Sequence, residues 1–370
     1  VLAGSARTQT PAHTQAQSPA FPYSPASIGD GWSVEPPAEA GFDPARLSAA
    51  LAGALDGRMD LHGLVVERRG HLVAEAYRAG EDKGVYSLFA RTRAFGPAVR
   101  HDTRSVGKSV IGLLVGIAQA QGKLGPLSTP VLDGFPEFKD LQTPDRRAIT
   151  LEHLLTMSSG LDWQEGGPGR DDEHKLYWKW TPAYYVLSRP VAAAPGTRWT
   201  YNSGGCLLLA DLVERATGTP LKAYVQTRLF GPLGITDWEW VGDLHGRPMA
   251  FTGLRMRPRD MAKLGRLVLD HGRWEGRQLV PETWIAASLT PRLETGFDGT
   301  RYGYFWWTGT VAWHGRELPW AAAFGNGGQR IFVVPDLDLC VVTTAGDYGS
   351  LATARRVDAL LQEIVHAVVR

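Results

Sequence analysis

One stretch decides the fold of this 370-residue chain: Arg104-Ser105-Val106-Gly107-Lys108-Ser109-Val110-Ile111-Gly112-Leu113-Leu114. From Val110 onward the residues are apolar on almost every side of a helix, and Val115 and Ile117 continue the pattern. A helix that is apolar all round is buried in the core of a protein. The sequence therefore predicts a central helix with a polar beginning at Ser105.

Ser105 and Lys108 are three residues apart, so they lie on the same face of that helix. A serine hydroxyl is a poor nucleophile until a neighbouring base takes its proton. A lysine can be that base when burial or a second cation lowers its pKa. The helix N-terminus would also favour an oxygen anion through the helix dipole. Since a Ser-x-x-Lys pair also occurs by chance, it needs partners elsewhere in the chain.

The bulk composition is that of a globular protein, with 44% hydrophobic and 21% charged residues. The length predicts one large domain or two closely joined ones. A net charge of +1 argues against nucleic acid or another polyanion as a partner. There is no apolar run of about 18 residues, so we expect no transmembrane segment.

The two cysteines, Cys206 and Cys340, each lie in an apolar run. We expect buried free thiols, although a single disulfide stays open without a distance. Neither cysteine has a spacing typical of metal ligands, and we expect no metal and no organic cofactor.

The first forty residues have the composition of an N-terminal arm. Val1-Leu2-Ala3-Gly4-Ser5-Ala6 resembles the end of a signal peptide, with small residues at a cleavage position. The alternative is that the sequence simply starts there. On the first interpretation the protein is periplasmic or secreted, and on the second it is cytoplasmic. Residues 7–40, rich in Thr, Pro, Ala, Gln and Ser, are too polar to build a core.

Elsewhere the pattern alternates between helix and strand, which predicts an α+β fold. Segment 80–100 is loop-like. The helices we expect are Asp43–Leu55, Thr150–Met157, Leu207–Ala216, Leu254–Leu269 and Leu351–Val369. The strands we expect are a hairpin over Gly63–Ala79, then strand character over Tyr302–Trp307 and Ala321–Thr344, clearest at Arg330–Val334 and Leu339–Thr343.

Residues 161–185 form a long loop rich in glycine and aromatic residues. Long loops in compact domains are usually functional, so we interpret this one as a lid or pocket wall. The alternative is a surface loop packed on its own aromatic side chains. Its candidate substrate-binding residues are Trp163, Tyr177, Trp178 and Trp180.

Two further motifs could meet Ser105. Tyr201-Asn202-Ser203 precedes a helix, and a tyrosine can relay a proton if neighbouring cations lower its pKa. Phe324-Gly325-Asn326-Gly327-Gly328-Gln329 leads into a strand. Glycines there let backbone N–H groups approach a substrate carbonyl, as an oxyanion hole requires.

These motifs together resemble those of the penicillin-recognising serine hydrolases. That family includes class C β-lactamases, D-alanyl-D-alanine carboxypeptidases, and related esterases and 6-aminohexanoate-dimer hydrolases. Ser105-x-x-Lys108 is similar to the first motif, Tyr201-Asn202-Ser203 to the second, and Asn326-Gly327-Gly328 to the third. Ile149–Leu161 and Leu229–Ile235 are similar to linking stretches of the family, and the resemblance runs from about Gly63 to the C-terminus.

The resemblance implies an antiparallel sheet flanked by N- and C-terminal helices, with an inserted all-helical subdomain. The arm would be residues 1–40, the sheet domain residues 41–104 plus 250–370, and the helical subdomain residues 105–249, with the site at their junction. It also implies Ser105 as the acyl-enzyme nucleophile and Lys108 with Tyr201 as the proton-transfer pair, oriented by Ser203. The oxyanion hole would be the backbone N–H groups of Ser105 and Gln329, or of Gly328 if the motif alignment slips by one residue.

Two departures from the family pattern bear on the substrate. Asn326 stands where the family has a cationic or ionisable residue that helps bind a substrate carboxylate, and Ser203 stands where many β-lactamases have Asn. Both favour an esterase or amidase that acts on a small-molecule ester or amide, with Asn326, Gly327 and Gly328 at the substrate. The alternatives are a true β-lactamase or D-Ala-D-Ala carboxypeptidase, and a catalytically silent envelope-binding protein of penicillin-binding type.

Overall fold

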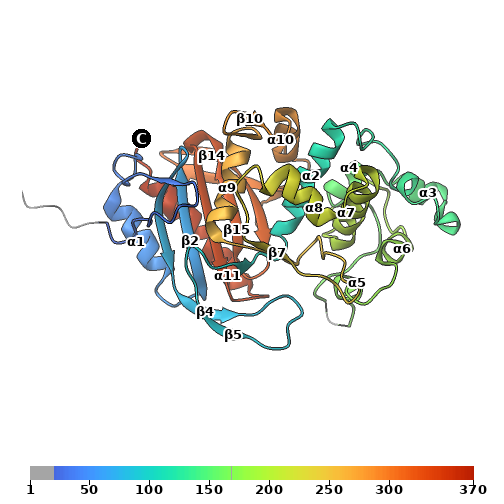
Figure 1. The fold of residues 1–370 in the computed structure, drawn as a ribbon, viewed down its shortest axis with the longest axis horizontal. Helices are drawn as coiled ribbons and strands as arrows, with labels where there is room; N and C mark the ends of the chain where they lie inside the picture. The colour runs from blue at the N-terminus through green and yellow to red at the C-terminus, as the bar shows by residue number, and fades with distance from the viewer. Residues whose placement is uncertain (1–20, 168) are drawn as a thin grey trace, which may run out of the picture.

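The computed structural model describes residues 21–167 and 169–370 (Figure 1). The signal-like residues 1–6 and the first half of the predicted arm lie outside this part. The second half of the arm lies against the sheet domain. Its short strand β1 (Ser33–Val34) pairs in parallel with β3 (His71–Tyr77), and the carbonyl of Tyr23 accepts a hydrogen bond of 2.9 Å from the N–H of Glu75.

The centre of the fold is a nine-stranded sheet with the order β1-β3-β2-β16-β15-β14-β13-β12-β11. All neighbouring pairs are antiparallel except the β1–β3 pair at one edge, so the predicted antiparallel sheet is confirmed with one parallel edge strand. Besides β1 and β3, its strands are β2 (Leu61–Arg68), β11 (Leu293–Glu294), β12 (Arg301–Tyr302), β13 (Trp307–Trp313), β14 (Arg316–Gly325), β15 (Gln329–Val334) and β16 (Leu339–Ala345). Smaller sheets pair β4 (Ala79–Asp82) with β5 (Arg91–Ala94), β9 (Arg273–Trp274) with β10 (Arg277–Gln278), and β6 (His101–Asp102) and β7 (Trp238–Trp240) with β8 (Leu254–Met256).

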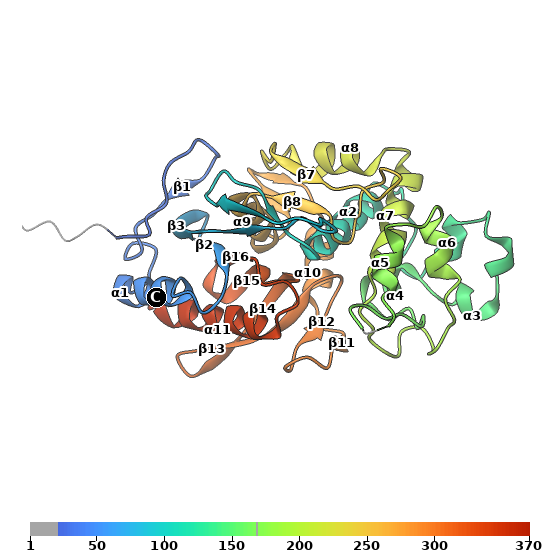
Figure 2. The ribbon, with the colours of Figure 1, turned by 90° about the horizontal axis from the view of Figure 1, so that it is seen from below.

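The two faces of the sheet are covered because side chains alternate along its strands. Val66 and Val341 belong to the core on one face, whereas Val65 and Val342 belong to the core on the other. On the first face α1 (Pro44–Ala54) and α11 (Leu351–Ala367) lie side by side, as Figure 2 shows. On the other face lie α9 (Pro258–Leu269) and α2 (Val106–Ala120).

The remaining helices gather mainly at one end of the molecule, in the region predicted to be a helical insert (Figure 1). The longest of them packs on α2. They are α3 (Pro144–Arg147), α4 (Leu151–Leu155), α5 (Asp172–Leu176), α6 (Pro182–Leu187), α7 (Ser203–Thr217) and α8 (Leu221–Val225), with the short turns η1 (Val131–Gly134), η2 (Lys139–Leu141) and η3 (Gln226–Phe230). Helix α10 (Glu282–Leu289) and turn η4 (Pro335–Leu337) belong to the sheet side.

Several local predictions are confirmed. The carboxylate of Asp43 caps α1, and Thr150 caps α4. The hairpin β2–β3 turns at Arg69 and Gly70, which both have positive φ. Cys206 and Cys340 are buried free thiols. In the part of the chain that the structure describes, no helix is long and apolar enough to cross a membrane.

Two local predictions are wrong in part. The helix predicted over Leu254–Leu269 opens at Pro258, as the proline indicates, but Leu254–Met256 form strand β8. The segment 80–100 contains the hairpin β4–β5. Residues 308–320, which lie between the two segments of predicted strand character, complete the β13–β14 hairpin. Whether such a segment forms a strand depends on pairing with a neighbouring strand, and the residue pattern of one segment shows this poorly.

Helix α2 lies so deep that its glycines are in contact with neighbouring elements. A Cβ on Gly116 would lie 2.3 Å from Cδ1 of Trp284 on α10. That indole cannot easily move, because its Nε1–H donates a 3.0 Å hydrogen bond to the carbonyl of Gly112, also on α2. The absence of a side chain at Gly116 therefore sets how closely α2 approaches α10.

We predict opposite effects for two Gly→Ala changes in helices. Gly116→Ala should lower the free energy of unfolding by about 2 kcal/mol, because overpacking outweighs the gain in helix propensity. Gly53→Ala in α1 is the matched control, since the nearest atom to its new Cβ is 4.0 Å away. It should raise the free energy of unfolding by up to about 1 kcal/mol. Urea unfolding measures both, and a stabilising Gly116→Ala would contradict the packing argument.

Candidate active site

The candidate site is a cavity of about 780 Å³ where the start of α2, the β14–β15 turn and the helical insert meet. Ser105, Tyr201 and Asn326 all line it, although they are far apart in the sequence. The charged residues of the lining are Arg104, Glu165, Asp171, Glu173 and Arg330.

Ser105 is held directly before α2. Thr103 holds the segment before the helix in place, since both its N–H and its hydroxyl donate to the carbonyl of Leu254, at 3.0 and 2.8 Å. Arg104 then has a φ of 50°, a strained value for a residue with a side chain. The Ser105 side chain does not cap the helix, so its hydroxyl is available for another partner.

That partner is Lys108, whose side chain is 1% exposed. Its Nζ donates one hydrogen bond of 2.9 Å to Ser105 Oγ and another of 2.9 Å to the carbonyl of Phe251. Nζ also lies 4.8 Å from the ring centroid of Tyr201. The structure thus brings together the three residues expected to move protons around the nucleophile.

The state of Tyr201 differs from the sequence expectation. Burial raises the pKa of its phenol well above the ordinary value, and the nearby carboxyls of Glu165 and Glu173 raise it further, while a hydrogen bond with Ser105 acts in the opposite direction. The resting phenol is therefore protonated. In this state Tyr201 can give a proton away, and Lys108 remains as the group that can accept one from Ser105.

The β14–β15 turn forms the opposite edge of the cavity. Gly327 and Gly328 have φ values of 88° and 92°, and a Cβ on Gly327 would lie 2.6 Å from the Tyr348 ring. Asn326 lines the cavity, and its Oδ1 accepts a 2.7 Å hydrogen bond from the N–H of Gly349. The side chain of Gln329 lies behind the turn and bonds the backbone of Asn326 and Ala345. The oxyanion role of the Gln329 N–H stays a prediction.

Of the four aromatic residues proposed for the pocket, only Trp163 lines it. After α5 the chain turns outward, away from Ser105. Tyr177 packs on Tyr86, with ring centroids 4.6 Å apart. Trp178 is 49% exposed, and Trp180 is 81% exposed beside His245. For these three residues the alternative interpretation holds, in which the loop packs on aromatic side chains at the surface and does not line the pocket.

The sequence reasoning missed the main aromatic wall, which consists of Trp199, Phe297, Trp307 and Phe324. Trp199 and Trp307 have ring centroids 5.5 Å apart, and Trp307 stacks on Phe324 at 5.1 Å. One signal was present: Trp199 is two residues before Tyr201, and alternate residues of an extended segment share a face. Phe324 also had a signal, because it begins the candidate motif that ends at Gln329, whereas Phe297 and Trp307 had no local signal.

The sequence reasoning also missed two carboxyls. Ser203, expected to orient Lys108 and Tyr201, has its Oγ 3.1 Å from Glu165 Oε2 and 2.8 Å from Glu173 Oε2, and its orienting role stays a prediction. Desolvation raises the pKa of Glu165 well above its ordinary value, and the charge of Glu173 adds to this effect. Both residues come from the glycine-rich loop, whose spacing carries no sign of a pair.

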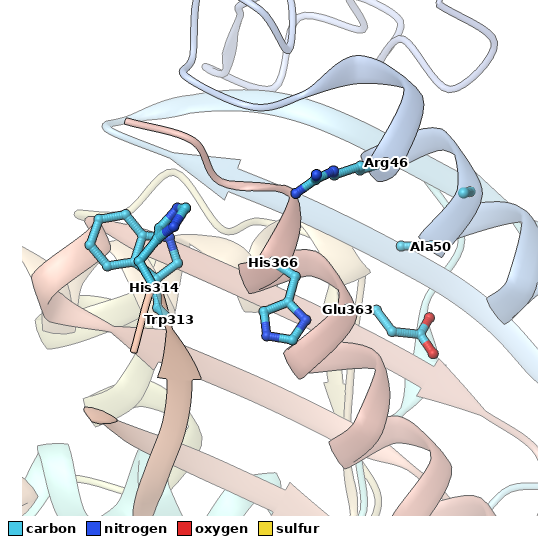
Figure 3. Close-up of a pocket in the computed structure, with 7 residues that line it drawn as sticks. Arg46, Ala50, Trp313, His314, Glu363 and His366 are labelled. Atoms are coloured by element: carbon cyan, nitrogen blue, oxygen red, sulfur yellow. The ribbon is translucent and has the colours of Figure 1, made fainter. Parts of the chain in front are cut away.

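A second cavity, of about 540 Å³, opens beside α1 and α11 (Figure 3). Arg46 and Ala50 of α1 face Glu363 and His366 of α11 there, with Trp313 and His314 at the β13–β14 hairpin. Its lining holds no serine, cysteine or lysine, so it offers no counterpart to the Ser105–Lys108 pair.

We predict that a fluorophosphonate probe labels Ser105, which peptide mapping can locate, and that Ser105→Ala abolishes labelling. Lys108→Arg should slow labelling by about 10²-fold or more, because guanidinium keeps its proton and cannot act as a base. Tyr201→Phe tests the phenol separately, since it removes the hydroxyl and keeps the ring. Labelling mapped to Ser158, Ser159 or Ser203, or a fast Lys108→Arg variant, would contradict the assignment.

Comparison with known proteins agrees with this geometry. Esterase EstB of Burkholderia gladioli is 33% identical over 228 residues, which are 55% of this chain and 55% of the esterase. The 6-aminohexanoate-dimer hydrolase of Paenarthrobacter ureafaciens is 26% identical over 299 residues, covering 75% of this chain and 70% of the hydrolase. The match thus spans about half the length of the esterase and 70% of the length of the hydrolase.

The fold has counterparts among solved structures as well. A penicillin-binding protein from Bacillus halodurans superposes with a TM-score of 0.62 at 20% identity, covering 85% of this chain and 99% of that one. The Beta-lactamase family model matches residues 51–365, which include Ser105, Tyr201 and Asn326. The resemblance drawn from the motifs is therefore confirmed, and this chain belongs to the beta-lactamase family of serine hydrolases.

Proposed function

We propose that this hydrolase cleaves a small-molecule ester or linear amide through an acyl-enzyme on Ser105. The observation that carries the proposal is the 2.9 Å contact between Lys108 Nζ and Ser105 Oγ inside a cavity with an aromatic wall. A nucleophile within hydrogen-bond reach of its base is the arrangement that acyl transfer requires. The intact pair also argues against the alternative of a catalytically silent binding protein.

The proposed reaction runs in two steps that use the same groups. Neutral Lys108 takes the proton of Ser105 as its oxygen bonds to the substrate carbonyl carbon, and the backbone N–H groups of Ser105 and Gln329 bind the resulting oxyanion. Tyr201 then donates its phenolic proton to the leaving alcohol or amine, and regains one from Lys108. Water next attacks the acyl group, and the reverse transfers release the acid and restore Ser105.

The charges around the cavity favour a substrate without a carboxylate. A carboxylate that enters a pocket loses hydration and needs a cation to offset that loss. Asn326 supplies no charge, and the rim carries Asp171 and Glu173. Both groups would act against a carboxylate in this part of the cavity.

Arg104 and Arg330 are the cations of this lining that argue for the β-lactamase or carboxypeptidase alternative. Arg104 donates a 2.9 Å hydrogen bond to the carbonyl of Lys83, and its guanidinium carbon lies 4.0 Å from the Tyr348 ring centroid.

The guanidinium of Arg330 also has partners. Nη1 donates to the carbonyls of Gly325 and Gln329, at 3.1 Å each, and Nε lies 3.4 Å from Asp358. The guanidinium carbon also stacks 3.8 Å from the Phe324 ring centroid. A substrate carboxylate would have to compete with these contacts.

The aromatic wall supports an acyl chain or an aromatic leaving group as the apolar part of the substrate. The similarity to an esterase and to a 6-aminohexanoate-dimer hydrolase supports the ester and amide classes. We therefore place esters and linear amides before β-lactams.

We predict that short-chain p-nitrophenyl esters are cleaved with a kcat/KM about 10²-fold or more above that for nitrocefin or benzylpenicillin, because a paired charge is missing at Asn326. Asn326→His should move the ratio toward the β-lactam by adding an ionisable group at that position. Steady-state kinetics on both substrate classes measure this, and Ser105→Ala gives the background. A wild type that prefers the β-lactam, or release of D-Ala from a peptide at a comparable rate, would move the alternative to first place.

A further inference from the structure

The glycine-rich loop brings two carboxyl groups into contact with one hydroxyl beside the reacting residues. Glu165 Oε2 lies 3.1 Å from Ser203 Oγ, and Ser203 Oγ lies 2.8 Å from Glu173 Oε2. The other oxygen of Glu165, Oε1, accepts from the backbone N–H of Ser203 and, at 2.7 Å, from Nε1–H of Trp163. Glu165 therefore makes hydrogen bonds through both of its oxygens.

Counting hydrogen atoms shows that two ionised carboxylates do not fit this arrangement. A serine hydroxyl carries one proton and can donate it to one acceptor. Ser203 Oγ contacts a carboxyl oxygen on each side, so one of these two contacts needs a proton from the carboxyl itself. The raised pKa of Glu165 assigns this proton to Glu165, and since Oε1 accepts two N–H groups, Oε2 is the oxygen that carries it. Glu165 Oε2 then donates to Ser203 Oγ, and Ser203 Oγ donates to Glu173 Oε2.

Two cations of the same loop are paired with other carboxylates. Arg170, from the same loop, is bound to Asp162 at 2.9 Å and to Asp172 at 2.7 Å. Lys175 lies 3.4 Å from Asp172 as well. Lys108 is the cation that faces Glu165, and its Nζ is bonded to Ser105 and to the carbonyl of Phe251. Two like charges that share a site cannot both ionise easily.

We propose that Glu165 is a positioning residue that stays a neutral carboxylic acid in the working enzyme, holding Ser203 and thereby the Tyr201 segment. Its link to Tyr201 is short, because the Ser203 N–H that it binds is the first of α7, two residues after the phenol. Its neutrality limits the pair to one negative charge beside Lys108 and Tyr201. The kinetic part of this inference rests on the proposed acyl-enzyme function.

The sign of the pH effect follows from the groups that face Glu165. As pH rises through the pKa of Glu165, a second negative charge appears, which raises the pKa of Tyr201 further. A weaker phenolic acid donates its proton to the leaving group less readily, so Glu165 contributes to the loss of kcat/KM on the alkaline side. The titratable groups around it are Lys108 of α2, Tyr201 and Cys206 at α7, Glu173 of α5, Tyr86 of the β4–β5 loop and Tyr302 of β12.

The test compares Glu165→Gln with Glu165→Ala. A Gln amide reproduces the neutral acid, because its oxygen accepts the two N–H groups and its NH₂ donates to Ser203, but it cannot ionise. Glu165→Ala should lower kcat/KM about tenfold or more, the effect of removing a buried hydrogen-bonding group. Glu165→Gln should recover most of that loss, and its alkaline limb should move to higher pH. A limb that does not move, or Gln no better than Ala, would overturn the proposal.

Infrared pH titration of the resting protein gives a readout that needs no substrate. The wild type should show the carbonyl stretch of a protonated carboxyl, and this band should be absent from Glu165→Gln. In Glu173→Gln the band should remain, but the pH at which it is half lost should be lower. The comparison with Glu165→Gln is needed because burial also raises the pKa of Glu67 and Asp211 to about 7. A band unchanged in Glu165→Gln would overturn the proposal. If Ser105→Ala kept its activity, the proposed function would fail while this titration still decided the state of Glu165.

Discussion

The site depends on a lysine amine held inside an apolar helix. Lys108 is buried on α2, where water cannot solvate it, and its remaining partners are Ser105 Oγ and the carbonyl of Phe251. Removing an amine from water is costly unless its hydrogen bonds are replaced. The surrounding structure supplies these replacements at fixed positions, which also fixes the direction in which the amine faces the nucleophile.

The rest of the fold keeps that environment closed. Helix α2 lies against the sheet on one side and against α7 on the other, and Trp284 donates a hydrogen bond to the carbonyl of Gly112 in its backbone. The β14–β15 turn approaches the start of α2 so closely that a Cβ on Gly325 would lie 2.2 Å from the carbonyl of Thr103. Reactive groups from three distant parts of the chain thus share one small volume because the packing leaves no alternative arrangement.

The sequence was most informative where a local pattern reports the environment directly. The all-round apolar run after Lys108 identified the buried helix, and the short apolar run Ile331–Val334 identified a central strand. It was least informative where the environment is made by distant residues. The aromatic wall joins Trp199 to Trp307 across the cavity, and the pair of Glu165 and Glu173 is formed by the path of a loop. The same limit explains Trp178 and Trp180, whose loop turned them toward the surface.

The place of β16 in the sheet has a consequence for how the chain folds during synthesis. Residues 339–345 form a central strand between β15 and β2, whose residues 61–68 are made much earlier. Until β16 emerges from the ribosome, the hairpin β2–β3 has an unpaired edge of the kind that promotes aggregation. Contacts of such large sequence separation also form slowly. The nascent chain therefore cannot complete its sheet, or the cavity beside it, until residue 345 has been synthesised, and the edge of the β2–β3 hairpin stays unpaired in the meantime.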